Sequence, residues 1–177
     1  MKPYICLLLL CWGMPVVAEF KPVDPTPYVT DVLNVIGPVK TPLTLSVAEL
    51  HALPAHTLKD VSLTCLTGSD KGTVKSYRGV LLRDVIDRAD ISALGKSDLK
   101  QLLIFAIASD NYRAVFTWNE VFNTNVGDGI LVLYEKDRSP LTAEEGHIAL
   151  ISSCDLHTGP RHVKWLKTIE LRKLTDM

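Results

Sequence analysis

The chain has 177 residues, of which 47% are hydrophobic, 22% charged and 7% aromatic. This composition is typical of an ordinary globular domain and excludes a disordered or fibrous protein. Its 19 basic and 20 acidic residues leave a formal net charge of −1, and neither sign forms a block, which argues against a nucleic-acid partner held by bulk electrostatics. The function of this chain is therefore expected to come from a local site.

The first 18 residues have the pattern of a secretory signal peptide. Lys2 precedes an apolar stretch over residues 4–14, and the small residues Val16 and Ala18 mark a cleavage point after Ala18. A membrane anchor is the alternative, but about 11 apolar residues extend only ~16 Å as a helix against a hydrocarbon core of ~30 Å. No twin-arginine pair accompanies Lys2, which indicates Sec-type export of an unfolded chain. We therefore expect a periplasmic or secreted protein with no stable membrane insertion after cleavage.

The rest of the chain is expected to form one domain with two flanking segments. Three prolines between residues 20 and 27 indicate an extended N-terminal arm over residues 19–41. The domain is predicted to cover residues 42–172, and residues 173–177 are left as a C-terminal tail.

Hydrophobic periodicity within the domain predicts mostly strands. Alternating or continuous apolar runs indicate strands at residues 43–45, 56–65, 73–77, 102–108, 112–117, 130–134, 148–152 and 163–171. Short helices are predicted after the capping box Ser46 to Glu49, over residues 81–88, and over residues 118–122. Short helices inserted between many short strands predict an α+β domain built on mixed or antiparallel sheet.

Two cysteines, Cys65 and Cys154, remain once residues 1–18 are removed. In an oxidising compartment two thiols are expected to form a disulfide. A bond between them would close a loop of about 90 residues and stabilise the fold by ~4 to 5 kcal/mol in the chain-entropy model. Unpaired thiols and a metal-ligating Cys65 are the alternatives.

Several segments, read in chain order, resemble one family. They are residues 63–68 (LTCLTG), 77–86 (YRGVLLRDVI), 130–135 (ILVLYE), 139–146 (SPLTAEEG), 159–166 (GPRHVKWL) and 169–171 (IEL). Together they resemble the molybdopterin-binding domain of the sulfite oxidase family over about residues 42 to 172, and the most specific piece runs from Arg161 to Leu166. The resemblance implies a β-rich, sulfite-oxidase-type fold with short inserted helices.

The resemblance also implies a molybdenum–molybdopterin cofactor and the residues that would hold it. Cys65 closes a strand as the family's ligating cysteine does, so it is the candidate thiolate ligand to molybdenum. His162, Val163 and Lys164 lie on the stretch that contacts the pterin ring and phosphate in the family, with Lys164 as a phosphate donor. Arg161 would be a nearby cationic group.

The chain also departs from the family pattern at anion-binding positions. After the cysteine, the segment Leu66 to Asp70 lacks the usual arginine, and Leu150 replaces another arginine four residues after Gly146. Ser153 to Asp155 replaces the Pro-Gly turn that normally follows.

These departures leave two function classes open. The first is an exported oxidoreductase that acts on a small oxoanion or sulfoxide and passes electrons to a separate redox protein, since no Cys-x-x-Cys-His haem motif is present. The second is a non-catalytic, cofactor-free descendant of the fold. It would serve as a periplasmic module that binds a small anionic ligand or a membrane sensor protein.

Overall fold

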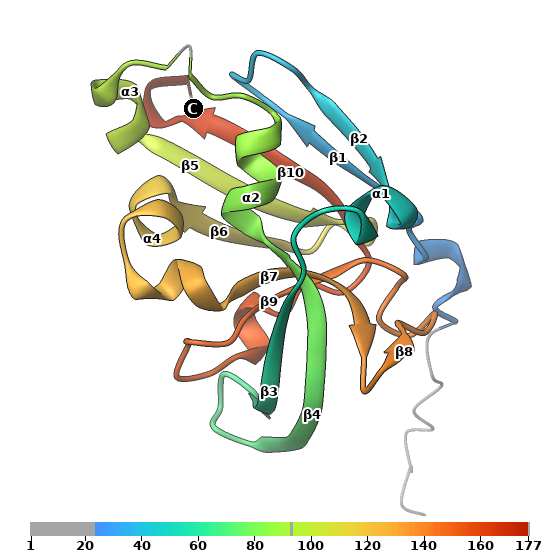
Figure 1. Cartoon of the computed structure of the whole chain (residues 1–177). Coiled ribbons are helices and arrows are strands. Elements are labelled where there is room, and N and C mark those ends of the chain that lie inside the picture. The colour runs from blue at the N-terminus through green and yellow to red at the C-terminus, as the bar shows by residue number, and fades with distance from the viewer. Residues whose placement is uncertain (1–23, 93, 177) are drawn as a thin grey trace, which may run out of the picture.

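The computed structural model describes residues 24–92 and 94–176, so the predicted signal peptide over residues 1–18 lies outside the described part. Two five-stranded sheets form the body of the molecule (Figure 1). The first sheet contains β1 (Val32–Ile36), β2 (Leu43–Ser46), β5 (Leu102–Ala108), β6 (Arg113–Thr117) and β10 (Leu166–Lys173), in the order β2-β1-β10-β5-β6. The second contains β3 (His56–Thr64), β4 (Asp70–Leu81), β7 (Ile130–Lys136), β8 (Ser139–Pro140) and β9 (Ala149–Ser152). Its order is β3-β4-β7-β8, and β9 also pairs with β7.

Short helices connect the strands. They are α1 (Val47–His51), α2 (Leu82–Arg88), α3 (Lys96–Lys100) and α4 (Trp118–Phe122). Among the described strands, β1 and β10 pair in parallel and every other pair is antiparallel. The predicted α+β, mixed and antiparallel fold is therefore confirmed.

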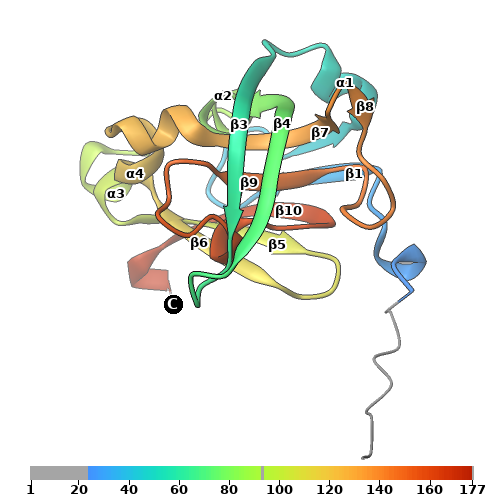
Figure 2. The same cartoon turned by 90° about the horizontal axis from the view of Figure 1, so that it is seen from below.

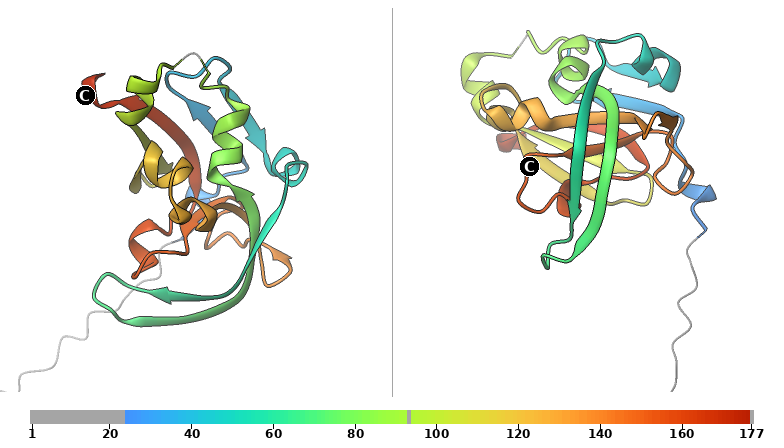
Figure 3. Two further views of the ribbon diagram at one scale, coloured as in Figure 1. Left: turned by 60° about the vertical axis from the view of Figure 1, so that its left-hand side comes forward. Right: turned by 60° about the horizontal axis from the view of Figure 1, so that its bottom comes forward.

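The main hydrophobic core lies between the two sheets, and β7 contributes to both of its faces. Ile130, Val132 and Tyr134 belong to the large cluster that includes residues of both sheets. Leu131 and Leu133 point to the opposite face and join a smaller cluster. The long β3–β4 hairpin covers that second face by bending around the sheet, as Figures 2 and 3 show. This bend places the end of β3 beside the loop that follows β9.

Local signals correctly located three of the four α-helices, α1, α2 and α4, whereas α3 was not predicted. At α1 the Ser46 side chain accepts a hydrogen bond from the Glu49 N–H, and the Glu49 carboxylate accepts one from the Ser46 N–H at 2.7 Å. Thr117 and Glu120 form the same capping box at α4. A capping box satisfies helix N–H groups within one turn, so it is readable from sequence alone.

The N-terminal arm is the largest difference from expectation. Residues 32–36, inside the segment predicted as an extended arm, form β1 between β2 and β10. Leu33 and Val35 are fully buried. The arm prediction is therefore wrong for this stretch, because β1 gains its burial and its parallel pairing from β10 at the other end of the chain.

The last strand also begins later than predicted. Val163 forms an isolated bridge to Leu150, and β10 starts only at Leu166, because Trp165 adopts a φ of 51° that no regular strand allows. The strand then continues to Lys173, into the predicted tail. Within the described residues, no helix is long and apolar enough to cross a membrane.

Candidate functional site

Cys65 lies immediately after β3, in a tight turn. Its N–H donates to the carbonyl of Ser69 at 2.9 Å, and its carbonyl accepts from the N–H of Gly68 at 2.8 Å. The residue is half-buried and its thiol is free. A thiol held at a strand end in this way is accessible and has a defined position.

A second loop, between β9 and β10, is fastened to the end of β3. The buried Thr158 hydroxyl donates to the carbonyl of Ser62 at 3.0 Å and accepts from the N–H of Thr64 at 3.1 Å. Gly159 follows, and a Cβ on it would lie 2.9 Å from the Thr64 carbonyl oxygen and 3.4 Å from the Cα of Cys65. The loop therefore packs directly against the Cys65 turn, and only glycine leaves room for this approach.

A Gly159→Ala variant should loosen this contact. Since the added methyl group would meet backbone atoms, the loop must move, at an expected cost of about 1 to 3 kcal/mol in the free energy of unfolding. Cys65 should then react faster with a thiol reagent such as Ellman's reagent. Gly95→Ala is the matched control, because the nearest atom to a Cβ there is the flexible Asp98 carboxylate at 3.8 Å. Equal labelling rates in the two variants would contradict this packing role.

Arg161 does not face an open anion site. Its guanidinium donates to Asp155 from Nε at 2.7 Å and from Nη2 at 2.5 Å, and to Glu120 from Nη1 at 2.9 Å. Its Cζ also lies 4.5 Å from the centre of the Phe116 ring. Hydrogen bonding to Asp155, and then to Glu120, raises the pKa of Arg161 despite its burial. Its charge is thus already compensated by two carboxylates.

The next three residues have three different environments. The His162 side chain is only 9% exposed, and its Nε2 is buried with no hydrogen-bond partner among the described residues. Val163 is fully buried and exchanges two 2.8 Å backbone hydrogen bonds with Leu150. Lys164 is exposed. Val163 therefore holds the segment to the core, whereas His162 and Lys164 supply polar groups.

His162 and Lys164 line a cleft that adjoins the Cys65 turn. The cleft has a volume of about 240 Å³ and is lined by Asp110, Tyr112, Gly159, His162, Lys164 and Trp165. Because Gly159 lines this cleft and also packs against the backbone of Cys65, the structure brings the Cys65 turn, His162 and Lys164 to neighbouring positions. It does not bring Arg161 or Val163 into this cleft.

The expected disulfide between Cys65 and Cys154 is not formed. Both cysteines are free. The Cys154 sulfur packs against Gly129 and lies 3.9 Å from the carbonyl oxygen of Asn125, whereas Cys65 packs against Gly159. The two cysteines pack against different neighbours, so the disulfide expected from the sequence is wrong.

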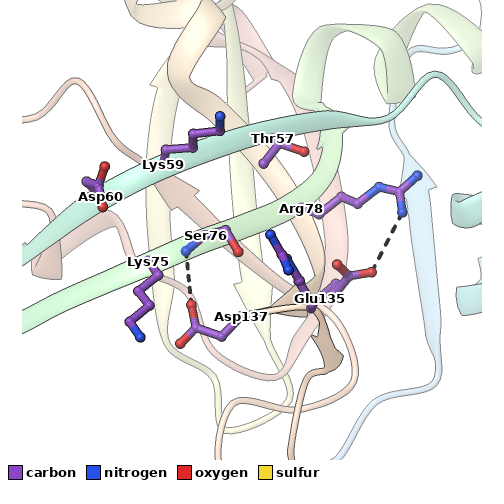
Figure 4. A pocket seen from close by; sticks show the side chains of 9 residues that line it. Thr57, Lys59, Asp60, Lys75, Ser76, Arg78, Glu135 and Asp137 are labelled. Atoms are coloured by element: carbon purple, nitrogen blue, oxygen red, sulfur yellow. Dashed lines mark hydrogen bonds and ion pairs between the residues drawn. The ribbon is translucent and has the colours of Figure 1, made fainter.

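A larger cleft lies elsewhere and contains none of the predicted site residues. It has a volume of about 680 Å³, on the outer face of the β3–β4 hairpin. Figure 4 shows Lys59 and Lys75 pointing away from each other. Asp137 accepts a hydrogen bond from the Ser76 N–H at 2.9 Å, and Arg78 lies 3.8 Å from Glu135. Its lining mixes four basic and three acidic side chains and therefore does not present a single sign of charge.

Residues 24–92 and 94–176 contain no group of three or more His, Cys, Asp and Glu side chains that could hold a metal ion by themselves. Cys154, His157 and His162 therefore do not form a zinc-type site. Molybdenum bound through a pterin needs a different donor set, in which the protein adds a thiolate.

Sequence reasoning missed three residues that shape the site: Thr158, Asp155 and Glu145. Thr158 hydrogen-bonds to the backbone of β3, and Asp155 accepts hydrogen bonds from Arg161 in the loop between β9 and β10. Glu145 accepts hydrogen bonds from side chains on β4 and β7. The only available signal was the short spacing between Asp155 and Arg161.

The fold and the cysteine site together define a class: a two-sheet, β-rich domain with a cysteine at a strand end, next to a loop whose residues line a cleft with His162 and Lys164. The family described as oxidoreductase molybdopterin binding domain matches residues 22–176, and the chain belongs to this family. Comparison of the sequence with curated proteins found no match.

A solved structure with the same fold is the sulfane dehydrogenase SoxCD from Paracoccus pantotrophus. The two chains superimpose with a TM-score of 0.61 and 16% sequence identity, over 85% of this chain and 39% of that one. At this identity the likeness shows the fold. The chain spans about 39% of the length of the SoxCD chain.

The residues around Cys65 fit a molybdopterin-type cofactor. The free, half-buried thiol is a soft ligand for molybdenum. The buried Nε2 of His162 lacks a hydrogen-bond partner within residues 24–92 and 94–176, and Lys164 lines the adjoining cleft, so both can serve a phosphate or a pterin edge. Gly159 allows close approach at the centre of this group.

Proposed function

We propose that the chain is an exported, molybdopterin-dependent oxidoreductase that acts on a small oxoanion or a sulfoxide. The observation that carries the proposal is the free, half-buried Cys65, whose turn packs against Gly159, a residue that lines a cleft with His162 and Lys164. Family membership supports the cofactor. The substrate class rests on the sulfite-oxidase resemblance and on the cationic Lys164 in the cleft.

Each residue has a defined task in this proposal. Cys65 would ligate molybdenum as a thiolate, and Lys164 would donate charge-assisted hydrogen bonds to the phosphate of the pterin. The ring nitrogen of His162 would hydrogen-bond to that phosphate or to the edge of the pterin. When bound, the cofactor supplies two-electron redox chemistry that can move an oxygen atom to or from the substrate. The Thr158–Gly159 loop fixes the position of the Cys65 turn relative to the cleft.

The expected cellular setting follows from the N-terminal pattern. A Sec-type signal over residues 1–18 sends the chain to the periplasm or to the outside of the cell. Electrons would pass to a separate redox protein. A nucleic-acid partner is not expected at a net charge of −1.

A second candidate function is a cofactor-free ligand-binding or sensory module. One observation favours it: the cationic positions that would strengthen an anion site are compensated or apolar. Asp155 and Glu120 already bind the Arg161 guanidinium, and Leu150 is fully buried. In this case the cleft beside Lys164 would bind a small anion, and a membrane sensor protein would read the bound state.

Elemental analysis of the exported protein separates the two functions. The proposed oxidoreductase should carry about one molybdenum per chain, and Cys65→Ser should lose most of it because a hydroxyl is a poor ligand for this metal. Cys154→Ser is the matched control and should keep the metal, since Cys154 is exposed and packs against Gly129. Protein without molybdenum in all three forms would reject the oxidoreductase and favour the binding module.

A further inference from the structure

A buried cluster of titratable groups lies behind Lys164. Its centre is Oε1 of Glu145, which accepts from the Tyr77 hydroxyl at 3.3 Å and from Lys136 Nζ at 3.2 Å. Nε2 of His162 lies 3.9 Å from the same oxygen, which is beyond hydrogen-bond distance. Glu145 and His162 each have side chains only 9% exposed. Among the residues that the structure describes, the cluster therefore holds one ring nitrogen without a hydrogen-bond partner.

Members of the cluster line two clefts. Lys136, Glu145 and Lys164 line a cleft of about 380 Å³. His162 and Lys164 line the cleft of about 240 Å³ that adjoins Cys65. Lys164 therefore lines both clefts, whereas Glu145 lines only the first and His162 only the second.

The charges around His162 come from several elements. Glu145 from the loop after β8 favours the charged ring, whereas Lys164 on its own segment and Lys136 from β7 disfavour it. Tyr77 from β4 meets the ring edge-on, with centroids 6.0 Å apart. The turn between β5 and β6 places Asp110 and Tyr112 in the same cleft. Burial is the strongest influence and lowers the pKa of His162 to about 4, so the ring is neutral at pH 7.

A bound anion would change this balance. A negative group beside Lys164 neutralises the nearest cation and adds a second negative charge beside the ring. An imidazolium near both the Glu145 carboxylate and a bound anion is stabilised by two negative charges, because each of them favours the charged form of the ring.

We propose that His162 takes up one proton from solvent when an anionic group binds beside Lys164, so that binding and protonation are coupled. The inference rests on the proposed function in placing an anion in this cleft. The anionic group can be a free oxoanion or the phosphate of the cofactor.

The coupling has a definite sign. Because the pKa of the ring is higher in the complex than in the free protein, affinity for the anion rises as the pH falls. The rise is up to about tenfold per pH unit between the pKa of the complex and that of the free ring, which is about 4.

NMR titration of the His162 ring in the mature chain tests the coupling, with molybdenum measured on the same sample. The probes are inorganic sulfate for a free oxoanion and phenyl phosphate for a phosphate monoester. In metal-free protein, a saturating probe should move the His162 titration to higher pH. In protein that carries the cofactor, the ring should already titrate at higher pH without a probe. A missing metal thus rejects the proposed enzyme, whereas an unchanged titration rejects the coupling.

Three variants make the result specific. His162→Gln should remove the pH dependence of probe binding. Glu145→Gln should weaken it, because the ring then faces only one anion. His56→Gln is the matched control, since this exposed ring pairs with Asp84 on the surface, and it should bind the probes as the wild-type does. A pH dependence that survives in His162→Gln, with folding confirmed by circular dichroism, would overturn the inference.

Discussion

An Arg161→Gln variant is expected to lose about 2 kcal/mol of unfolding free energy at pH 7. Removing one partner of a buried ion pair leaves an uncompensated charge and costs about 3 to 5 kcal/mol, and partial exposure reduces this. Here the Asp155 side chain is 14% exposed and the Glu120 side chain 36% exposed. Urea denaturation of the two proteins measures the difference.

The two carboxylates that bind Arg161 make the stability difference between wild-type and Arg161→Gln depend on pH. Burial acts to raise the pKa of Asp155 and of Glu120, but hydrogen bonds, including those from Arg161, outweigh it and lower both pKa values. The stabilisation is therefore complete above the unfolded values of 3.8 and 4.5. It is lost as the pH falls through the lower folded values. Wild-type and Arg161→Gln stabilities should converge in that range.

Arg172→Gln is the matched control for this experiment. Its guanidinium pairs with Glu170 at the surface, at 2.7 Å, and is more exposed than that of Arg161. Its loss should change stability far less, because exposed ion pairs contribute little. Equal destabilisation by the two substitutions would show that the ion pairs of Arg161 contribute no more to stability than an exposed pair does.

A Leu33→Ala variant is expected to lose about 3 kcal/mol of unfolding free energy, because it empties a site in the core. Leu33 is fully buried on β1, and β1 connects β2 to β10. Thermal or urea unfolding, followed by circular dichroism, measures the loss. A loss of this size would establish β1 as part of the folded domain and not of an extended N-terminal arm.

Val32→Ala serves as the control, since it shortens the neighbouring side chain, which is 38% exposed. We expect its cost to stay below about 1 kcal/mol. If both substitutions cost the same, the burial of β1 between its neighbours is not what stabilises this region.

The candidate site was only partly readable from sequence. Cys65 could be placed at a strand end because β3 has a period of two, and the resemblance pointed to the stretch from Arg161 to Lys164. The roles within that stretch could not be separated. Arg161 looked like an anion-binding group, but Asp155 and Glu120 compensate it, and Glu120 lies 41 residues away.

Glu145 shows the same limit more sharply. Beside Glu144 in a polar loop, it looks like a solvated surface residue. The structure buries it against Tyr77, which is 68 residues away along the chain. No local sequence pattern indicates such a partner, because the contact is stabilised by burial and hydrogen bonding between distant segments.

The sequence by itself determined the class of fold, the family, three of the four α-helices, the capping box of α1 and most of the strands. Each of these depends on residues within a few positions of one another or on a motif read in order. Only the tertiary structure decided that β1 belongs to the core, that Cys65 and Cys154 stay apart, and that His162 has an unpartnered nitrogen facing Glu145. These features depend on which segments meet in space, and that choice is made by burying the whole apolar surface at once.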